Sequence, residues 1–112
     1  MQIFFENPEL REALEFKATA DRTYGEPVAA KLRARCADIV SSDSVAGLPG
    51  FIKPEIEYKN DVDYLIITLI GTIKLFFVIG HGNPPKHEDG QVNWHRVTRL
   101  KLIHIGDDYD FE

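Results

Sequence analysis

Apolar residues recur along the first third of the chain with the spacing of helices. Asn7 and Pro8 provide a helix start, because an Asn side chain can cap a helix and Pro fits its first turn. Apolar side chains then recur every three or four positions, with an interruption at Gly25. We therefore expect two helices, over residues 8–23 and 26–41, packed as a helical hairpin.

From residue 51 onward the pattern changes to short runs rich in β-branched and aromatic residues. Gly71-Thr72 joins two of these runs tightly enough for a hairpin, whereas a Gly- and Pro-rich segment over 81–90 predicts a long loop. A further apolar run near the N-terminus also suits a strand. The expected strands are residues 2–5, 51–58, 64–70, 73–79 and 97–105.

Together these elements predict one α+β domain over residues 1–112, with an N-terminal strand, a helical hairpin and then an antiparallel sheet of three to four strands. The nearly continuous apolar runs at 64–70 and 73–79 indicate strands that are covered on both faces. Cys36 falls on the apolar stripe of the second helix, so we expect a core residue rather than a nucleophile. As the only cysteine, it also excludes an intrachain disulfide framework.

The charge balance argues against general nucleic-acid binding, since 13 basic residues face 18 acidic ones and the net charge is −5. Basic residues nevertheless cluster in two places. We interpret the cluster over 31–35 as the solvated face of a helix. Near the last expected strand, Arg96, Arg99 and Lys101 are candidate contacts to phosphates, although surface charge on such a strand is also common.

No apolar run approaches the roughly 18 residues that a membrane-spanning helix needs, and the N-terminus lacks the pattern of a secretion signal. These features predict a cytoplasmic protein without a membrane partner. Three histidines, His81, His87 and His95, share one loop region, but none of their spacings is that of a strong zinc motif. We therefore expect neither a metal site nor a cofactor.

Several segments, in a fixed order, carry a family resemblance. Residues 24–35 (Tyr-Gly-Glu-Pro-Val-Ala-Ala-Lys-Leu-Arg-Ala-Arg) form one helix entry, and residues 71–77 (Gly-Thr-Ile-Lys-Leu-Phe-Phe) form one strand. An acidic turn ending at Gly90, then Trp94, then a strand over 97–105 complete the series. In this order the segments resemble the HigB-like toxins, a branch of the RelE/ParE superfamily of bacterial toxin–antitoxin systems that includes plasmid-maintenance killer proteins.

The resemblance implies a RelE-like fold and, in active members, metal-independent cleavage of mRNA at the ribosome, neutralised by a helix-turn-helix antitoxin of the HigA type. Such RNA hydrolysis needs a general base and acid, with fixed cations near the phosphate. At the matching positions, Lys74 and Lys53 stand where relatives carry Arg or His. Tyr109 keeps part of the terminal Asp-Tyr-His motif, and Asp110 stands near the place of its histidine.

The same resemblance makes His104 a candidate for a displaced acid–base group, since an imidazole exchanges protons near neutral pH. Strand alternation predicts that His104 faces away from Ile103 and Ile105. Each candidate also has a structural interpretation: His104 as a hydrogen-bonded structural histidine, Lys74 as a solvent-reaching edge lysine, and Tyr109 as a ring packed on the sheet.

Two other functions stay open beside the ribonuclease toxin. One is a catalytically inactive member that keeps the fold as a protein-interaction module. The acidic residues Asp107, Asp108 and Asp110, together with the missing histidine, favour this interpretation. The other is a ParE-like poison of DNA gyrase, which needs no ribonuclease residues.

Overall fold

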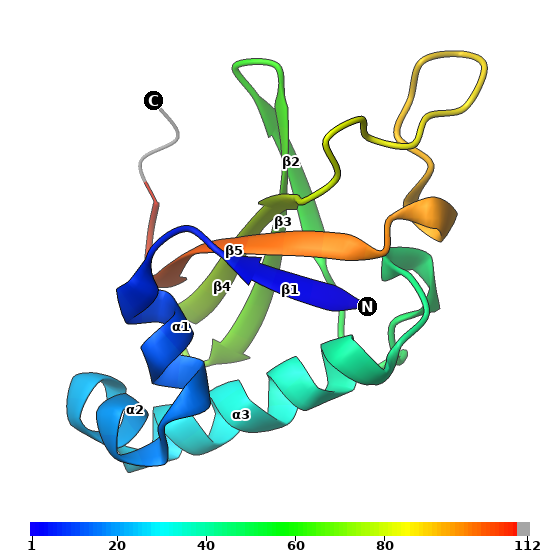
Figure 1. Ribbon diagram of the computed structural model, residues 1–112. Helices are drawn as coiled ribbons and strands as arrows, with labels where there is room; N and C mark the ends of the chain where they lie inside the picture. The colour runs from blue at the N-terminus through cyan, green and yellow to red at the C-terminus, as the bar shows by residue number, and fades with distance from the viewer. Residues whose placement is uncertain (110–112) are drawn as a thin grey trace.

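The computed structural model describes residues 1–109, in which five strands form one sheet and three helices pack beside it (Figure 1). Asn7 caps the first helix, since its side chain accepts a hydrogen bond from the Leu10 N–H at 3.0 Å, and Pro8 follows in the first turn. The elements are, in chain order, β1 (Gln2–Phe5), α1 (Pro8–Glu15), α2 (Lys17–Tyr24), α3 (Glu26–Ser41), η1 (Val45–Gly47), β2 (Glu55–Lys59), β3 (Val62–Ile70), β4 (Ile73–Ile79), η2 (Trp94–Arg96) and β5 (Arg99–Gly106).

The sheet confirms the expected α+β class but is mixed rather than purely antiparallel. Its strand order is β1-β5-β4-β3-β2, and the neighbours from β2 to β5 run antiparallel. β1 instead lies parallel to β5, with Ile3 opposite Leu100. A parallel pair needs a long crossover, which the helices and the other strands supply here. The N-terminal strand therefore joins the sheet as an edge strand and brings the number of strands to five.

The single helix expected over residues 8–23 is divided into two helices, α1 and α2. The expectation was therefore wrong at Phe16, where they meet. Phe16 has an extended backbone (φ −122°, ψ 113°) between α1 and α2, although no Gly or Pro marks the break. After the break α2 packs beside α3, where the Asp21 carboxylate contacts Lys17 at 2.7 Å and Arg33 at 3.6 Å. Gly25 (φ 84°) then allows the turn into α3, whose bounds confirm the second expected helix.

Several strand boundaries also differ from the expectation, since β3 begins at residue 62 instead of 64 and β5 covers 99–106 instead of 97–105. β2 begins only at Glu55, because Pro54 cannot donate to a strand ladder and Ile52 lies in a turn, its N–H bonded to the carbonyl of Pro49 at 2.9 Å. The β2–β3 turn consists of Asn60 and Asp61, which both have positive φ (51° and 63°). A tight two-residue turn of this kind suits the twist of an antiparallel hairpin.

The main core lies between the helices and one face of the sheet, hereafter the helix face. Alternation along each strand places the largest buried side chains there. Cys36 of α3 belongs to the same core, as expected, and burial raises the pKa of its thiol to about 12. The fully buried side chains include Leu32, Ile39, Leu65, Ile67, Leu75, Phe77, Leu100 and Leu102.

The opposite face of the sheet is not covered by helices, and Figure 1 shows α1, α2 and α3 gathered on one side. We call this second side the open face. It is nevertheless partly buried, since Tyr64, Ile66 and Phe76 are each less than 9% exposed. The expectation that β3 and β4 are covered on both faces is therefore confirmed. Within residues 1–109, no helix is long and apolar enough to cross a membrane.

Candidate functional site

One area of the open face gathers three of the four residues expected to act in catalysis, Lys74, His104 and Tyr109. Lys74 lies in β4 opposite Gly106, on the face that the helices leave uncovered. His104 lies opposite Phe76, two positions along β4 from Lys74. Lys74 and His104 are therefore diagonal neighbours, roughly 7–8 Å apart at their Cα atoms and within reach of one bound group. We call these residues, together with Phe76, the open-face patch.

A β-bulge at Ile103 decides which way His104 points. Over one step of β4 the pairing moves from Leu102 to His104, so Ile103 is the extra residue of the bulge. Leu102 faces the helices, and strict alternation would turn His104 toward the helices as well. The bulge instead brings His104 to the open face and returns Ile105 to the core. The expectation that His104 and Ile105 face opposite sides of the sheet is confirmed. Ile103, as the extra residue of the bulge, does not follow the strand alternation that the expectation assumed.

An aromatic cluster holds the centre of the patch. The ring centroid of Tyr109 lies 5.6 Å from that of His104, 5.7 Å from Phe76 and 6.0 Å from Tyr64. Phe76 and His104 are 5.7 Å apart, and all four pairs are tilted. Distances and tilts of this kind are favourable for aromatic pairs. Tyr109 thus packs on the sheet, which confirms its structural interpretation and also holds the imidazole from one side.

The chain after β5 folds back over the open face through two acidic residues. The Thr72 hydroxyl donates a hydrogen bond to the Asp107 carboxylate at 3.0 Å, which ties the chain to the β3–β4 turn. The Asp108 carboxylate accepts a hydrogen bond from the backbone N–H of Tyr109 at 2.8 Å. Both acids therefore help to place Tyr109 on the patch. Asp110 lies outside the described residues.

The three residues expected to contact RNA are not gathered at the patch. Arg99 is the first residue of β5, seven positions before Gly106, which is roughly 23 Å along an extended strand. Arg96 lies still earlier, in η2. Lys101 is closer, but its ammonium contacts the carboxylate of Glu6 at 3.1 Å. These side chains form a separate basic area near the start of β5.

The remaining catalytic candidate, Lys53, is exposed and lies two residues before β2. β2 starts at the end of the sheet where β4 also starts, so Lys53 and Lys74 lie at the same end. Lys74 is half-buried and forms no ion pair with any residue in the described range 1–109. Its positive charge is therefore available to an anion on the open face.

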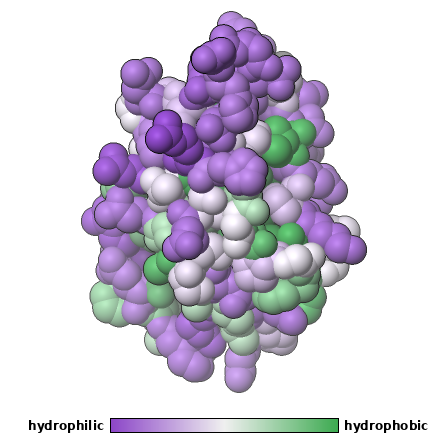
Figure 2. All heavy atoms as spheres, turned by 90° about the vertical axis from the view of Figure 1, so that its right-hand side faces the viewer, coloured by the Kyte–Doolittle hydropathy of each residue, from purple (hydrophilic) through white to green (hydrophobic). Residues whose placement is uncertain are grey.

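A cavity of about 460 Å³ adjoins the patch, and the loop between β4 and β5 forms its other wall. Its size falls within the range of small-molecule sites, and aromatic and apolar side chains dominate the sheet side. The loop and the β2–β3 turn form the upper end of the molecule in Figure 1, and the corresponding end is hydrophilic in Figure 2. Tyr64, Val78 and Tyr109 line it on the sheet side and Pro84, Lys86 and Val92 on the loop side, and the acidic residues Glu6, Asp61 and Asp63 also line it.

His81 fastens this loop to β5. Its Nε2 atom accepts a hydrogen bond from the backbone N–H of Thr98 at 3.0 Å, so this nitrogen carries no proton. Burial and, to a lesser extent, the positive charge of Arg99 lower the pKa of His81. His81 is therefore a structural histidine. Within residues 1–109, no three His, Cys, Asp or Glu side chains lie close enough together to hold a metal ion.

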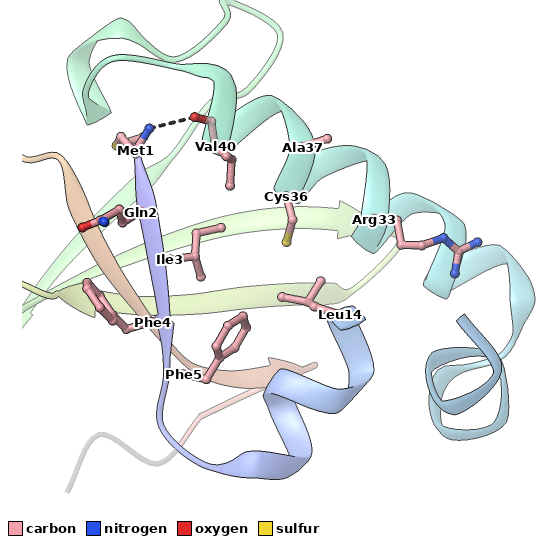
Figure 3. A pocket seen from close by; sticks show the side chains of 10 residues that line it. All are labelled: Met1, Gln2, Ile3, Phe4, Phe5, Leu14, Arg33, Cys36, Ala37 and Val40. Atoms are coloured by element: carbon pink, nitrogen blue, oxygen red, sulfur yellow. Dashed lines mark hydrogen bonds between the residues drawn. The ribbon is translucent and has the colours of Figure 1, made fainter. Parts of the chain in front are cut away.

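A second hollow lies on the other side of the molecule, between the edge strand β1 and α3 (Figure 3). It measures about 680 Å³, and apolar side chains such as Ile3, Cys36 and Val40 line it. The amino group of Met1 donates a hydrogen bond to the carbonyl of Val40 at 2.8 Å, where the two elements approach each other. We call this hollow the β1 groove.

Sequence reasoning missed part of the patch. It gave no role at the site to Phe76, Tyr64 or Gly106, and it used Thr72 only as part of a predicted turn. Alternation along the strand over 64–70 was the available signal for Tyr64. No local pattern identifies Thr72, because its hydrogen bond to Asp107 depends on how the chain after β5 folds back. Gly106 contacts His104 within β5 itself, but the sequence does not report how closely the imidazole approaches it.

Comparison with known proteins finds no matching family model, no similar curated protein and no similar solved structure. The assignment of a function therefore depends on the chemistry of the open-face patch and on the resemblance of the sequence segments.

Proposed function

We propose that this protein is the toxin component of a type II toxin–antitoxin system and cleaves mRNA at the ribosome without a metal ion. The observation that carries the proposal is that a histidine lies near a lysine that has no ion pair within residues 1–109, on the sheet face that the helices leave free and next to a cavity that Tyr64 and Tyr109 help to line. A partner of the helix-turn-helix antitoxin class completes the proposal.

In the proposed reaction His104 acts as the general base. It takes the proton of a ribose 2′-hydroxyl, and the 2′-oxygen then attacks the adjacent phosphorus. The bond from phosphorus to the 5′-oxygen breaks, and the leaving oxygen takes a proton from water. The hydroxide left behind is neutralised by the proton that His104 took up, which returns the imidazole to its neutral form. The products are a 2′,3′-cyclic phosphate and a 5′-hydroxyl.

Lys74 has the second role, because the phosphate gains negative charge as the 2′-oxygen attacks. A fixed ammonium nearby stabilises this charge, and its contribution grows where water is excluded. Lysine acts as a point charge and lacks the planar fork of an arginine. The adjoining cavity, with Tyr64 and Tyr109 on its sheet side and Lys86 on the loop, suits a nucleobase beside the scissile phosphate.

The proposed requirement for the ribosome explains how a chain with a net charge of −5 acts on RNA. An acidic protein binds free RNA weakly, because few phosphate counterions are released. An mRNA held by the ribosome is already presented, so a small number of contacts is sufficient. We therefore expect cleavage of mRNA under translation and little cleavage of free RNA.

A purified translation reaction tests the proposal, with cut sites mapped by primer extension. His104→Ala should lower the cleavage rate about 10²–10⁴-fold and Lys74→Ala about 10²–10³-fold. Lys31→Ala, a change of the same kind on the exposed surface of α3, should cleave like the unmodified protein. Absence of ribosome-dependent cleavage, or cleavage that is indifferent to both patch variants, would reject the ribonuclease.

The β1 groove favours a second candidate, a module that acts only by binding its antitoxin. β1 is an edge strand, and an edge strand beside an apolar groove can accept an extended segment of a partner. Ala37 lines the groove and is exposed, whereas Ala34 is exposed on α3 but does not line it. Ala37→Arg should therefore weaken binding of the antitoxin encoded beside this gene, and Ala34→Arg should not. Calorimetry with the purified pair would measure both.

A further inference from the structure

Gly106, the last residue of β5, stands where a side chain would collide with His104. A Cβ atom placed on Gly106 would lie 2.8 Å from His104 Nε2 and 3.5 Å from its Cε1. Other glycines, such as Gly82, have open space at this position. Gly106 is also not among the described glycines with positive φ, so its backbone does not require a glycine. The three heavy atoms nearest to this position all belong to the His104 imidazole.

The imidazole of His104 is therefore held from several sides. Gly106 lies against its Nε2 edge, while the rings of Tyr109 and Phe76 lie 5.6 Å and 5.7 Å from it. The bulge at Ile103 sets the direction of the side chain from the backbone. A ring restrained in this way keeps one position relative to Lys74 on the neighbouring strand.

We propose that Gly106 is a positioning residue that fixes the His104 imidazole beside Lys74. The inference rests on the proposed function in so far as it concerns cleavage. Gly106 itself touches no reacting atom: it acts by leaving room for the ring. A methyl group at residue 106 would move the imidazole, since the end of a side chain yields more easily than the strand. A shift of about 1 Å at a reacting group can lower a rate on the order of 10²-fold.

Gly106→Ala tests the inference, with Gly82→Ala as the matched control in open space. Nuclear magnetic resonance of the ring protons reports the position of His104, because the neighbouring Tyr109 and Phe76 rings shift their signals. The His104 ring signals are assigned as those that disappear from the spectrum of His104→Ala. In Gly106→Ala these signals should move and the cross-peaks between His104 and Tyr109 should weaken. In Gly82→Ala both should stay as in the unmodified protein. Cleavage of ribosome-bound mRNA should fall about 10–100-fold in Gly106→Ala only.

The same substitution in a His104→Ala background separates positioning from folding. Without the imidazole the methyl group has room, so Gly106→Ala should leave the Tyr109 and Phe76 signals and the urea midpoint of His104→Ala unchanged. If Gly106→Ala changes the Tyr109 and Phe76 signals as much in the His104→Ala background as in the unmodified protein, the inference is overturned. The added methyl group would then clash with the strand itself. Unmoved His104 signals in Gly106→Ala would also overturn the inference, as would full cleavage despite a displaced ring.

The two proposals fail in different ways. If the unmodified protein cleaves nothing while the His104 ring moves in Gly106→Ala, the ribonuclease proposal fails and the positioning of the ring by Gly106 stands. If cleavage depends on His104 but Gly106→Ala neither moves the ring nor slows the reaction, the ribonuclease stands and Gly106 has no positioning role.

Discussion

The two faces of the sheet bury similar side chains by different means. On the helix face, Leu75 and Phe77 of β4 are completely buried under α3, as part of a continuous apolar core. On the open face, Phe76 of the same strand is 3% exposed, but a tyrosine from the chain after β5 contributes to its cover. The core cluster on the helix face consists of apolar side chains, whereas Lys74 and His104 lie on the open face. One face thus provides stability, and the other leaves room for chemistry.

Removal of a large side chain from the helix face should have the largest effect on stability. Phe77→Ala would leave a cavity in a close-packed core, which typically costs about 3–5 kcal/mol. Urea denaturation followed by circular dichroism would measure the change. Phe51→Ala is the matched control, since Phe51 is 65% exposed and its ring centroid lies 5.1 Å from the guanidinium carbon of Arg35. It should cost no more than about 1 kcal/mol. Equal losses in both variants would contradict the comparison.

On the open face, removal of the Tyr109 ring should have an intermediate effect. Tyr109→Ala loses ring contacts that are each worth about 0.5–1.5 kcal/mol and uncovers Phe76. Tyr109→Phe retains the ring and should keep most of the stability. Urea midpoints of the two variants give the difference, and increased binding of a hydrophobic dye would report the uncovered face. If Tyr109→Ala were as damaging as Phe77→Ala, the open face would be a second core rather than a light cover.

The loop beside the open face should respond to acid through His81. Because the pKa of His81 is lowered in the folded protein from its ordinary 6.5, folding favours the neutral ring. The stability from its hydrogen bond is therefore fully present above about pH 6.5 and is lost as the pH falls through the lower folded value. His81→Ala should cost about 0.5–1.5 kcal/mol at pH 7 and lose less stability than the unmodified protein on acidification.

Urea titrations between pH 7.5 and 5 would follow this difference. His87→Ala serves as the control, because His87 is exposed on the same loop. It should keep the pH dependence of the unmodified protein. If stability falls with pH to the same extent in the unmodified protein and in both variants, His81 does not fasten the loop.

The smallest stability change should come with one of the largest functional changes. Lys74→Ala removes a half-buried charge without an ion pair among the described residues, so the unfolding free energy should stay within about 0.5 kcal/mol. Its effect on mRNA cleavage should nevertheless be about 10²–10³-fold. Stability and cleavage are measured on the same preparation, with Lys31→Ala alongside. A loss of stability in proportion to the loss of cleavage would assign Lys74 to the fold instead.

The helix face was more predictable from the sequence than the open face, and for a physical reason. Periodicity reports which side chains of an element share a side, and it identified the α3 stripe, including Cys36, correctly. It does not report the bulge at Ile103, because an inserted residue leaves the apolar pattern of a short strand almost unchanged. The break at Phe16 was invisible for a similar reason, since neither Gly nor Pro marks it.

The candidate site was predictable only residue by residue. Lys74, His104 and Tyr109 were identified, but their proximity depends on the register of β4 and β5 and on the path of the chain after Gly106. Arg96 and Arg99 were grouped with Lys101 because they are close in sequence, yet an extended strand separates them from the patch. A spacing of two residues along a strand predicts a shared face, not a shared site.

The parallel pairing of β1 with β5 has a consequence for the timing of synthesis. Ile3 cannot meet Leu100 until nearly the whole chain has been translated, roughly 5–20 s later at about 5–20 residues per second. His104, Gly106 and Tyr109 are made later still. A growing chain therefore carries neither the β1–β5 pairing nor the assembled patch until these residues have been added. The strand that is made first is thus among the last to find its partner.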